Sequence, residues 1–474
     1  MNEFNIYESV FDACVTGSIV VTDTQNLISN LPIQGTERLS FKLTTKLENE
    51  TEDTVINCLE SHGKEMHVYA ITDKRQLSDT VLTYTIHFAS REFVRNLRTR
   101  VSESFSGRMD QMVNKIFTDP DYLDSQKTLY YQPTRNQDKI VVPNLNPFAA
   151  IGMMARRSLP EIDGSKGVGY LFYETTKGFN FRSWESLCVD KSGHMRDAKQ
   201  QFRYVQGNMP SEPGKKKSRA DVIEDAYQNV ESYRFISNFH DVAANTNLGT
   251  YGHRVITHNI YNKSYRKDDY HYHNRWNQTN HLEDFPSIVD SPVDYDTIEG
   301  TPYQKGVSDY PEARVSLQAT TQFAHNEDTG SYGTPVEDDG VLTGARISQV
   351  NKILQGTQLE MTVNGQARLQ AGDVIDFDLQ SVQNRLDSQG GLDPQYSGRY
   401  IITSIRHRIA QEKFIQILIC VKDSSKSGHG YAADKTFTEM AGEKRKRNSQ
   451  DINQSDDTPV LVAPKYKGAW HPGV

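Results

Sequence analysis

The chain has 474 residues, 36% of them hydrophobic, and a net charge of −8, a length that corresponds to roughly three domains. No apolar run approaches the ~20 residues of a membrane span, and the start Met-Asn-Glu-Phe-Asn lacks the basic and apolar stretches of a secretion signal. Plentiful tyrosine (24) and phenylalanine (19) favour a β-rich protein with long polar loops over a helical bundle.

The four cysteines, Cys14, Cys58, Cys188 and Cys420, are scattered along the chain, and none belongs to a C-x-x-C pair. That spacing offers neither a zinc ribbon nor a redox motif. We expect reduced, mostly buried thiols in a protein that is synthesised in the cytoplasm.

The negative charge is concentrated in one segment. Residues 283–340 hold 13 acidic and 2 basic residues, a net charge of −11, which leaves about +3 for the remainder of the chain. Such a segment argues against an outer surface that grips nucleic acid. It is either a solvated loop or a surface that repels DNA or docks a basic partner.

The first 95 residues have the alternation of a small antiparallel sheet or barrel. Apolar and polar side chains alternate over 39–43 and 82–88, and the runs 19–21 and 67–71 are further strand candidates. The segments 30–35 and 61–63 have the composition of turns between such strands.

The next segment predicts two helices and a hairpin. An amphipathic stripe runs over 105–117 and stops at Asp119-Pro120. A second helix begins at Asn146-Pro147, where the proline suits the first helical position. The run 169–187 then predicts a hairpin that turns at Lys177-Gly178.

The C-terminal half repeats the strand-rich pattern. Ile347, Val350, Ile353 and Leu354 recur at helical spacing, and Gly356 stands at the position of a C-terminal cap. Four strand-like runs follow, over 359–363, 369–379, 397–407 and 414–421. In the second of them, Ile375, Phe377 and Leu379 share one face, and Asp376 and Asp378 share the other.

Several blocks resemble a known family. The turn Ala371-Gly372-Asp373 followed by the run 397–409 is similar to the last barrel of phage tail hub proteins. That family includes the baseplate hubs of contractile-tailed phages, the late control D proteins and the N-terminal part of type VI secretion spikes. The run 169–187 resembles the hairpin of these proteins, and 249–272 resembles the first strand pair of their second barrel.

The resemblance implies an α+β, β-rich chain with two tube-type antiparallel β-barrels, a middle α/β unit and a polar C-terminal arm. The expected division is a first barrel at 1–97, a middle helix-plus-hairpin domain at 98–190, a linker or helix at 191–231, a second barrel at 232–275 and 342–422, an acidic loop insertion at 276–341 and an extended arm at 423–474. The arm carries the basic run 444–447. It is either a solvated linker or a segment that orders on a partner or touches DNA.

The function that the resemblance implies is structural. A homotrimeric baseplate hub in the virion tail would join the six-fold tail tube protein to the trimeric central spike and contact other baseplate proteins. DNA would pass through its lumen without specific binding. The alternatives are a spike of a type VI-like injection system and a tail-tip protein that binds or degrades cell wall.

Five histidines are the first candidates for chemistry: His253, His258, His271, His273 and His281. Alternation along a strand would place His271 and His273 on one face, where a symmetric trimer could gather imidazoles around a metal. No cysteine or glutamate has a matching ligand spacing. The histidines are therefore interpreted as polar residues of a tyrosine-rich segment, and we expect no metal and no cofactor.

Acidic pairs occur at Asp268-Asp269, Asp338-Asp339 and Asp376/Asp378, but neighbours on an exposed strand do not form the opposed carboxyls of a glycosidase. Ser183 and Cys188 have no identifiable base partner, and no nucleophile elbow, zincin motif or phosphate loop is present. The aromatic residues Phe179, Phe181 and Trp184 are interpreted as a packed hairpin face. We expect no catalytic residues and no enzyme activity.

Overall fold

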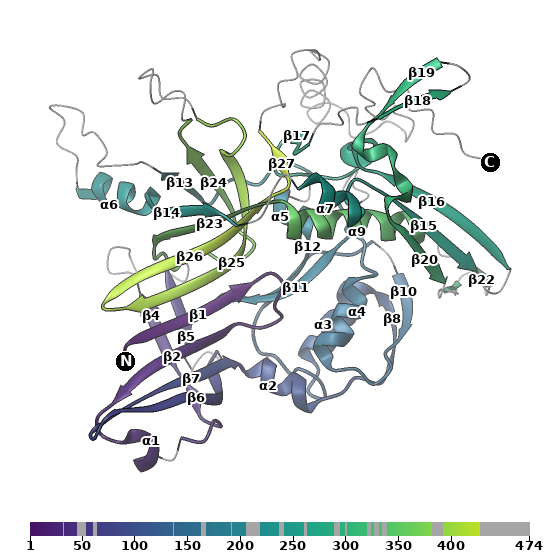
Figure 1. The fold of residues 1–474 in the computed structure, drawn as a ribbon. Coiled ribbons are helices and arrows are strands. Elements are labelled where there is room, and N and C mark those ends of the chain that lie inside the picture. The colour runs from purple at the N-terminus through teal and green to yellow at the C-terminus, as the bar shows by residue number, and fades with distance from the viewer. Residues whose placement is uncertain are drawn as a thin grey trace.

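The computed structural model shows a β-rich α+β chain (Figure 1). It describes residues 1–31, 33–44, 54–59, 64–135, 137–162, 167–190, 192–204, 219–236, 241–259, 263–288, 294–298, 301–319, 324–326, 331–333, 339–381 and 392–426. The predicted C-terminal arm, with its basic run 444–447, lies outside these residues from position 427 onward.

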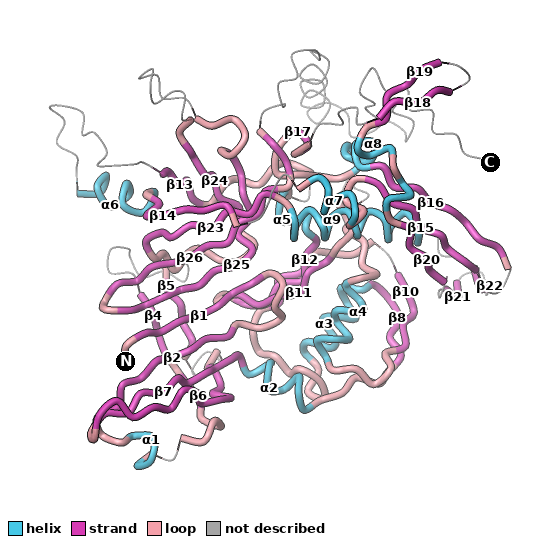
Figure 2. The backbone as a smooth tube through the Cα atoms, viewed as in Figure 1, coloured by secondary structure: helices cyan, strands magenta, loops and turns pink. Residues whose placement is uncertain are grey.

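One large sheet contains strands from both ends of the chain (Figure 2). Its main path is β14 (Val230–Phe235), β23 (Thr357–Asn364), β26 (Lys413–Lys422), β25 (Gly398–Ala410), β1 (Glu3–Ser9), β2 (Thr16–Asp23), β7 (Val81–Ser90), β6 (Met66–Ser78) and β3 (Arg38–Leu39). Two further strands, β24 (Val374–Leu379) and β13 (Gln200–Tyr204), extend it from β25. The central ladder is the antiparallel pair β1 and β25, in register from Glu3 opposite Ala410 to Ser9 opposite Ser404.

Six of these strands, β13, β24, β25, β26, β23 and β14, surround one hydrophobic core and are called here the C-terminal β-module. Its interior contains Phe202, Leu359, Phe377, Tyr400 and Leu418, all essentially buried. The predicted alternation is confirmed, because Ile375, Phe377 and Leu379 are buried whereas Asp376 and Asp378 are less so. Within the described residues, a single bridge between Arg203 and Asn229 lies where β13 approaches β14, so no continuous ladder closes the module into a barrel.

The N-terminal β-module consists of β1, β2, β7, β6 and β3 with the separate pair β4 (Phe41–Thr44) and β5 (Val55–Cys58) packed against them. Phe4, Phe41 and Phe88 meet in its core with ring centroids 4.9 to 5.9 Å apart. The short helix α1 (Leu27–Asn30) lies at its edge. The predicted sheet of the first 95 residues is confirmed, and the strands described there form no closed barrel.

In the middle unit, two of the helices pack beneath a small sheet (Figure 1). Its elements are α2 (Arg91–Arg98), β8 (Ser104–Arg108), α3 (Met109–Thr118), β9 (Leu129–Tyr131), β10 (Gln137–Val141), α4 (Pro147–Ala155), β11 (Tyr170–Thr175), β12 (Gly178–Ser183) and α5 (Trp184–Cys188). The predicted hairpin is confirmed as β11 and β12. The first helix begins later than predicted, because 104–108 pairs as a strand with β10 and Gly107 has a φ of +126°.

The segment between the middle unit and the last strands contains more regular structure than the predicted linker and loop. It holds α6 (Arg219–Gln228), α7 (Val242–Asn247), β15 (Gly252–Asn259), β16 (Ser264–His271), α8 (Tyr272–Arg275), η2 (Trp276–Gln278), β17 (Phe285–Pro286), β18 (Asp294–Ile298), β19 (Thr301–Lys305), η3 (Val307–Asp309), η4 (Pro311–Ala313), β20 (Val315–Ala319), β21 (Ala324–Asn326), β22 (Ser331–Gly333) and α9 (Asp339–Gln355). The helix expected around 347–354 is confirmed as part of α9. The last strand in the described residues, β27 (Ser424–Ser425), pairs with β17.

The strand pair β15 and β16 differs from its predicted place in the second barrel. It forms a separate three-stranded sheet with β20, which belongs to the acidic insertion. Arg254 also makes side-chain contacts on both sides of β15, with Asp269 on β16 at 2.7 Å and with Glu312 next to β20 at 2.7 Å. The place expected for this pair in the C-terminal β-module is instead taken by β13 and β14, which pair with β24 and β23.

Candidate functional site

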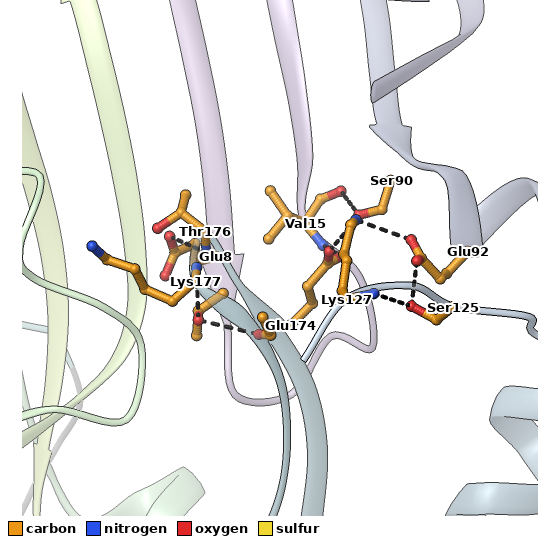
Figure 3. A network of polar contacts seen from close by, with 11 residues as sticks. Glu8, Val15, Ser90, Glu92, Ser125, Lys127, Glu174, Thr176 and Lys177 are labelled. Carbon is orange, nitrogen blue, oxygen red and sulfur yellow. Dashed lines mark hydrogen bonds and ion pairs between the residues drawn. The ribbon is translucent and has the colours of Figure 1, made fainter. Parts of the chain in front are cut away.

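A buried ion network lies where the N-terminal β-module meets the middle unit (Figure 3). The ammonium of Lys127 lies 3.0 Å from a carboxylate oxygen of Glu92 and 2.6 Å from one of Glu174. The three side chains are 4%, 1% and 2% exposed. Glu92 comes from α2 and Glu174 from β11, so one cation joins the end of the large sheet to the hairpin.

The two carboxylates also accept hydrogen bonds from both units. Glu92 accepts the hydroxyl of Ser125 at 2.6 Å. Glu174 accepts the backbone N–H of Val15 at 2.9 Å and the hydroxyl of Ser90. Because Val15 precedes β2 and Ser90 ends β7, Glu174 fixes the ends of two neighbouring strands against β11.

Burial disfavours the charged form of all three groups. The interaction of each group with its partners determines whether its pKa rises or falls. Burial would lower the pKa of Lys127, but Glu174 and Glu92 raise it above its ordinary value. Burial raises the pKa of Glu174, and the nearby Glu92 adds to that effect. For Glu92 the burial effect is outweighed by Lys127 and the Ser125 hydroxyl, which lower its pKa. The cation is therefore essential to a site that holds two carboxyls.

A second buried polar network lies where β1 pairs with β25. The carboxylate of Glu8 accepts the backbone N–H groups of Thr176 at 3.0 Å and Ala371 at 3.1 Å. His407 Nε2 lies 3.4 Å from the same carboxylate. Although burial would raise the pKa of Glu8, these contacts with His407 and the two amides lower it.

The tautomer of His407 follows from its neighbour Gln416. The Gln416 amide is oriented by Gln366, since its oxygen accepts the Gln366 N–H at 2.9 Å and its nitrogen donates to the Gln366 carbonyl at 2.7 Å. The same nitrogen lies 3.0 Å from His407 Nδ1. An amide nitrogen only donates, so Nδ1 accepts and the ring proton sits on Nε2, facing Glu8.

Both networks hold the turn of one hairpin. Glu174 is the last residue but one of β11, Thr176 begins the turn, and the Thr175 hydroxyl contacts Gln370 Oε1 at 2.9 Å. A Cβ at Gly372, whose φ is +94°, would collide with the Tyr173 hydroxyl. The hairpin therefore touches the N-terminal module on one side and the 370–372 turn of the C-terminal module on the other. The arrangement fixes the relative position of the two modules and the hairpin.

The candidate histidines do not contact one another as a group, and four of them each have a different local partner. His253 is buried, stacks on Tyr270 with centroids 4.9 Å apart, and has its pKa lowered by burial. His271 contacts Asp309 at 2.8 Å, His273 contacts Ser308 at 2.7 Å, and His281 contacts Asp423 at 2.9 Å. His258 is exposed. Within the described ranges, no group of three or more His, Cys, Asp or Glu side chains has the geometry to hold a metal ion.

The predicted acidic pairs do not form a shared site in the parts described. Asp269 binds Arg254, Asp268 lies 2.8 Å from Arg266, and Asp378 lies 3.5 Å from Arg203. Asp376 lies on the outer face of β24 and Asp339 begins α9, whereas Asp338 falls outside the described residues.

The nucleophile candidates have structural contacts. The Ser183 oxygen caps α5 by accepting the Ser186 N–H at 3.2 Å, and its hydroxyl donates to Gln132 Oε1 at 2.7 Å. Cys188 is buried and unbridged, as are the other three cysteines. Phe179 and Phe181 are buried on the hairpin as predicted, whereas the prediction is wrong for Trp184, which begins α5 after the hairpin strand ends at Ser183 and packs in a separate core cluster.

Sequence reasoning did not single out Lys127, Glu8, Glu92 or Glu174. The available signal was a carboxylate at the end of an apolar strand, as in Tyr-Leu-Phe-Tyr-Glu174, since an ionised side chain in such a place is buried only with a partner. The partner itself, 47 residues away, has no local signature.

Known tail proteins have similar structures. A 43 kDa tail protein of prophage MuSo2 from Shewanella oneidensis is 11% identical, with a TM-score of 0.43 over 89% of this chain and 94% of that chain. A tail protein from Neisseria meningitidis is 9% identical, with a TM-score of 0.45 over 89% and 92%. An Escherichia coli type VI secretion component, described as similar to T4 tail proteins gp27 and gp5, is 10% identical, with a TM-score of 0.40 over 90% and 75%.

With TM-scores below 0.5, these likenesses carry no inference about what this chain does. No protein-family model and no curated relative matches the sequence. Among the described helices, none is both long enough and apolar enough to cross a membrane.

Proposed function

We propose that this chain is a non-enzymatic structural protein, the central hub of a phage contractile-tail baseplate. The observation that carries the proposal is the pairing of β1 with β25, which joins two β-modules from opposite ends of the chain into one sheet. The sequence blocks that resemble tail hub proteins support it, because 169–187, 371–373 and 397–409 all meet at this junction.

The proposed role is that of a symmetry adaptor. Three copies, each contributing two β-modules, would present six modules around one axis, as closed three-fold symmetry allows. Such a ring would stack on the six-fold tail tube protein on one side and hold the trimeric central spike on the other, in contact with other baseplate proteins. In the virion, DNA would pass through the lumen without specific binding.

The two buried polar networks around Glu8 and Glu174 support this role, because an adaptor must keep its two modules at a fixed angle. Hydrogen-bonded charges at Glu8 and Glu174 tie the hairpin to both modules, and satisfied buried polar networks of this kind favour one arrangement over others. A flexible linker between the modules would not preserve the spacing that a six-fold partner requires.

The ends of the large sheet support assembly. β3 and β14 end its main path in the described residues. Unpaired strand edges favour pairing with another chain. Neighbouring protomers would cover such edges in a ring.

Electron microscopy of the purified full chain tests the proposal. The expected end-on class averages show a ring of six β-modules with three-fold symmetry around a central hole. Particles with a single module per subunit, or with the two modules directed away from a common axis, would rule the adaptor out. A cell-wall hydrolysis assay on the same sample is expected to give no activity, and hydrolysis would favour a tail-tip enzyme instead.

A further inference from the structure

Residues 276–286, called here the latch segment, connect α8, which follows β16, to the end of the C-terminal β-module. The segment runs from η2 to β17, and β17 pairs with β27. Side chains from two other regions bind its backbone. The Asn280 N–H donates to Glu185 on α5 at 2.9 Å, and the Leu282 N–H donates to Asp423 at 3.3 Å. The latch segment therefore bridges the middle unit and the last strands of the C-terminal β-module.

A buried histidine–aspartate pair lies at the centre of this contact. His281 Nδ1 lies 2.9 Å from Asp423 Oδ2, and the two side chains are 6% and 3% exposed. His281 Nε2 lies 3.1 Å from the carbonyl oxygen of Trp276 and 2.9 Å from the Thr279 hydroxyl. The imidazole also stacks on the Trp276 indole, with ring centroids 3.5 Å apart and the two planes inclined by 1°.

These partners favour a proton on each ring nitrogen of His281. A carbonyl oxygen only accepts hydrogen bonds, so Nε2 donates to Trp276. An ionised carboxylate also only accepts, so a proton lies between Nδ1 and Asp423 as well. A neutral ring that accepted the Thr279 hydroxyl would instead direct the Nε2 lone pair at the Trp276 carbonyl oxygen. The stacked indole adds to this preference, because its face attracts a cationic ring.

Closure of the latch segment therefore binds a proton. Histidine ordinarily titrates between pH 5 and 8. When it shares a proton with a buried carboxylate, it keeps that proton to a higher pH than the same histidine in a released segment. The closed state is thus favoured at low pH, and its advantage is lost as the pH rises through the range in which the closed pair gives up the proton.

Other charged groups lie near the pair, and their effects differ in sign. They are Glu185 on α5, Tyr272 on α8, Glu283 in the latch segment, Arg399 on β25, Lys422 at the end of β26, and Lys426. Burial lowers the pKa of Lys422 to about 8, so the loss of its proton removes a buried charge and opposes release. Burial raises the pKa of Glu283, so its ionisation at higher pH favours release. A test must therefore separate His281 from Glu283.

We propose that the His281–Asp423 pair is a proton-dependent latch: it holds the latch segment on the C-terminal β-module while a proton lies between the two side chains, and it releases the segment when that proton is lost. Release loosens the connection between the sheet of β16, β15 and β20 and the C-terminal β-module. The inference goes beyond the hub assignment and does not depend on it, because these contacts lie within one chain.

Hydrogen–deuterium exchange of the full chain, read by mass spectrometry and corrected for the intrinsic effect of pH, tests the latch. The informative amides are those of Leu282 and Glu283, which donate to Asp423 and to the Ser424 hydroxyl. Their protection is expected to fall at least tenfold between pH 6 and pH 9, the factor for one unit of pKa difference, and to return at pH 6. Protection of β25 should stay constant, which separates release from global unfolding. Equal protection of the latch segment at both pH values would overturn the proposal.

Variants assign the proton. His281→Gln keeps a donor for Asp423 but does not titrate, so we expect its latch segment to be equally protected at pH 6 and pH 9. Asp423→Asn removes the carboxylate and should move the loss of protection at least one pH unit lower, again a tenfold effect. His194→Gln is the matched control, because His194 and Asp190 form an exposed pair at 3.7 Å, and it should behave as wild type. A fall in folded His281→Gln protein as large as in wild type would overturn the proposal and assign the proton to Glu283.

Discussion

Replacement of Lys127 by methionine is the most direct test of the buried ion network formed by Lys127, Glu92 and Glu174. Methionine preserves most of the apolar stem, so the change removes mainly the ammonium that lies between Glu92 and Glu174. Two carboxyls that are 1% and 2% exposed would then lack their cation. Removal of one partner from a buried ion pair costs about 3–5 kcal/mol. We expect Lys127→Met to lose that much free energy of unfolding at pH 7.

The loss should shrink as the pH falls. Burial and the adjacent Glu92 already raise the pKa of Glu174 above that of an unfolded glutamate. Without Lys127 the folded variant takes up a proton that the unfolded chain does not yet hold, and this uptake stabilises the folded state as the pH decreases from 7 to 5. Urea denaturation at both pH values measures the effect.

Lys115→Met is the matched control, because Lys115 forms an exposed pair with Glu103, with side chains 48% and 40% exposed. Such surface pairs contribute about 0–1 kcal/mol. If Lys127→Met lost no more than this control, or if its deficit were the same at pH 7 and pH 5, the reasoning about an uncompensated buried charge would be wrong.

Three further changes have defined outcomes. Glu8→Gln should lose about 1–3 kcal/mol of the free energy of unfolding at pH 7. Because the fold lowers the pKa of Glu8, this difference from wild type should diminish as the pH falls below the ordinary glutamate pKa. Urea denaturation at pH 7 and pH 4 measures the difference. Gly17→Ala should destabilise by about 1–3 kcal/mol, since its Cβ would strike the Phe88 ring and lie 2.5 Å from the Asn5 carbonyl oxygen. Gly152→Ala has nothing within 4 Å of the new Cβ and lies inside α4, so thermal denaturation should show a gain of up to ~1 kcal/mol.

The strand-rich ends and the middle hairpin were predictable because their signals are local. Alternation along 374–379 places apolar side chains on one face, whichever strand pairs with this segment. The turn at Lys177-Gly178 is predictable because glycine favours turns. The start of α3 was misplaced because Phe105 fits a helical stripe, whereas Gly107 and the pairing with β10 decide for a strand.

Strand partners and buried charges were not predictable in this way. Nothing local distinguishes β15 as a partner of β20 rather than of the large sheet, since even the side-chain contacts of Arg254 on β15 involve residues 15 and 58 positions away. In the sequence, nothing distinguishes Lys127 from an exposed lysine, because only the fold places Glu92 and Glu174 beside it. Long-range pairing depends on tertiary packing, which a single sequence does not reveal.

The mass of the assembled species tests the central claim most directly. Light scattering after size exclusion should give three times the 53.9 kDa chain mass for the full-length protein, and a larger complex once the tail tube protein is added. A stable monomer that remains a monomer with the tube protein present would contradict the account.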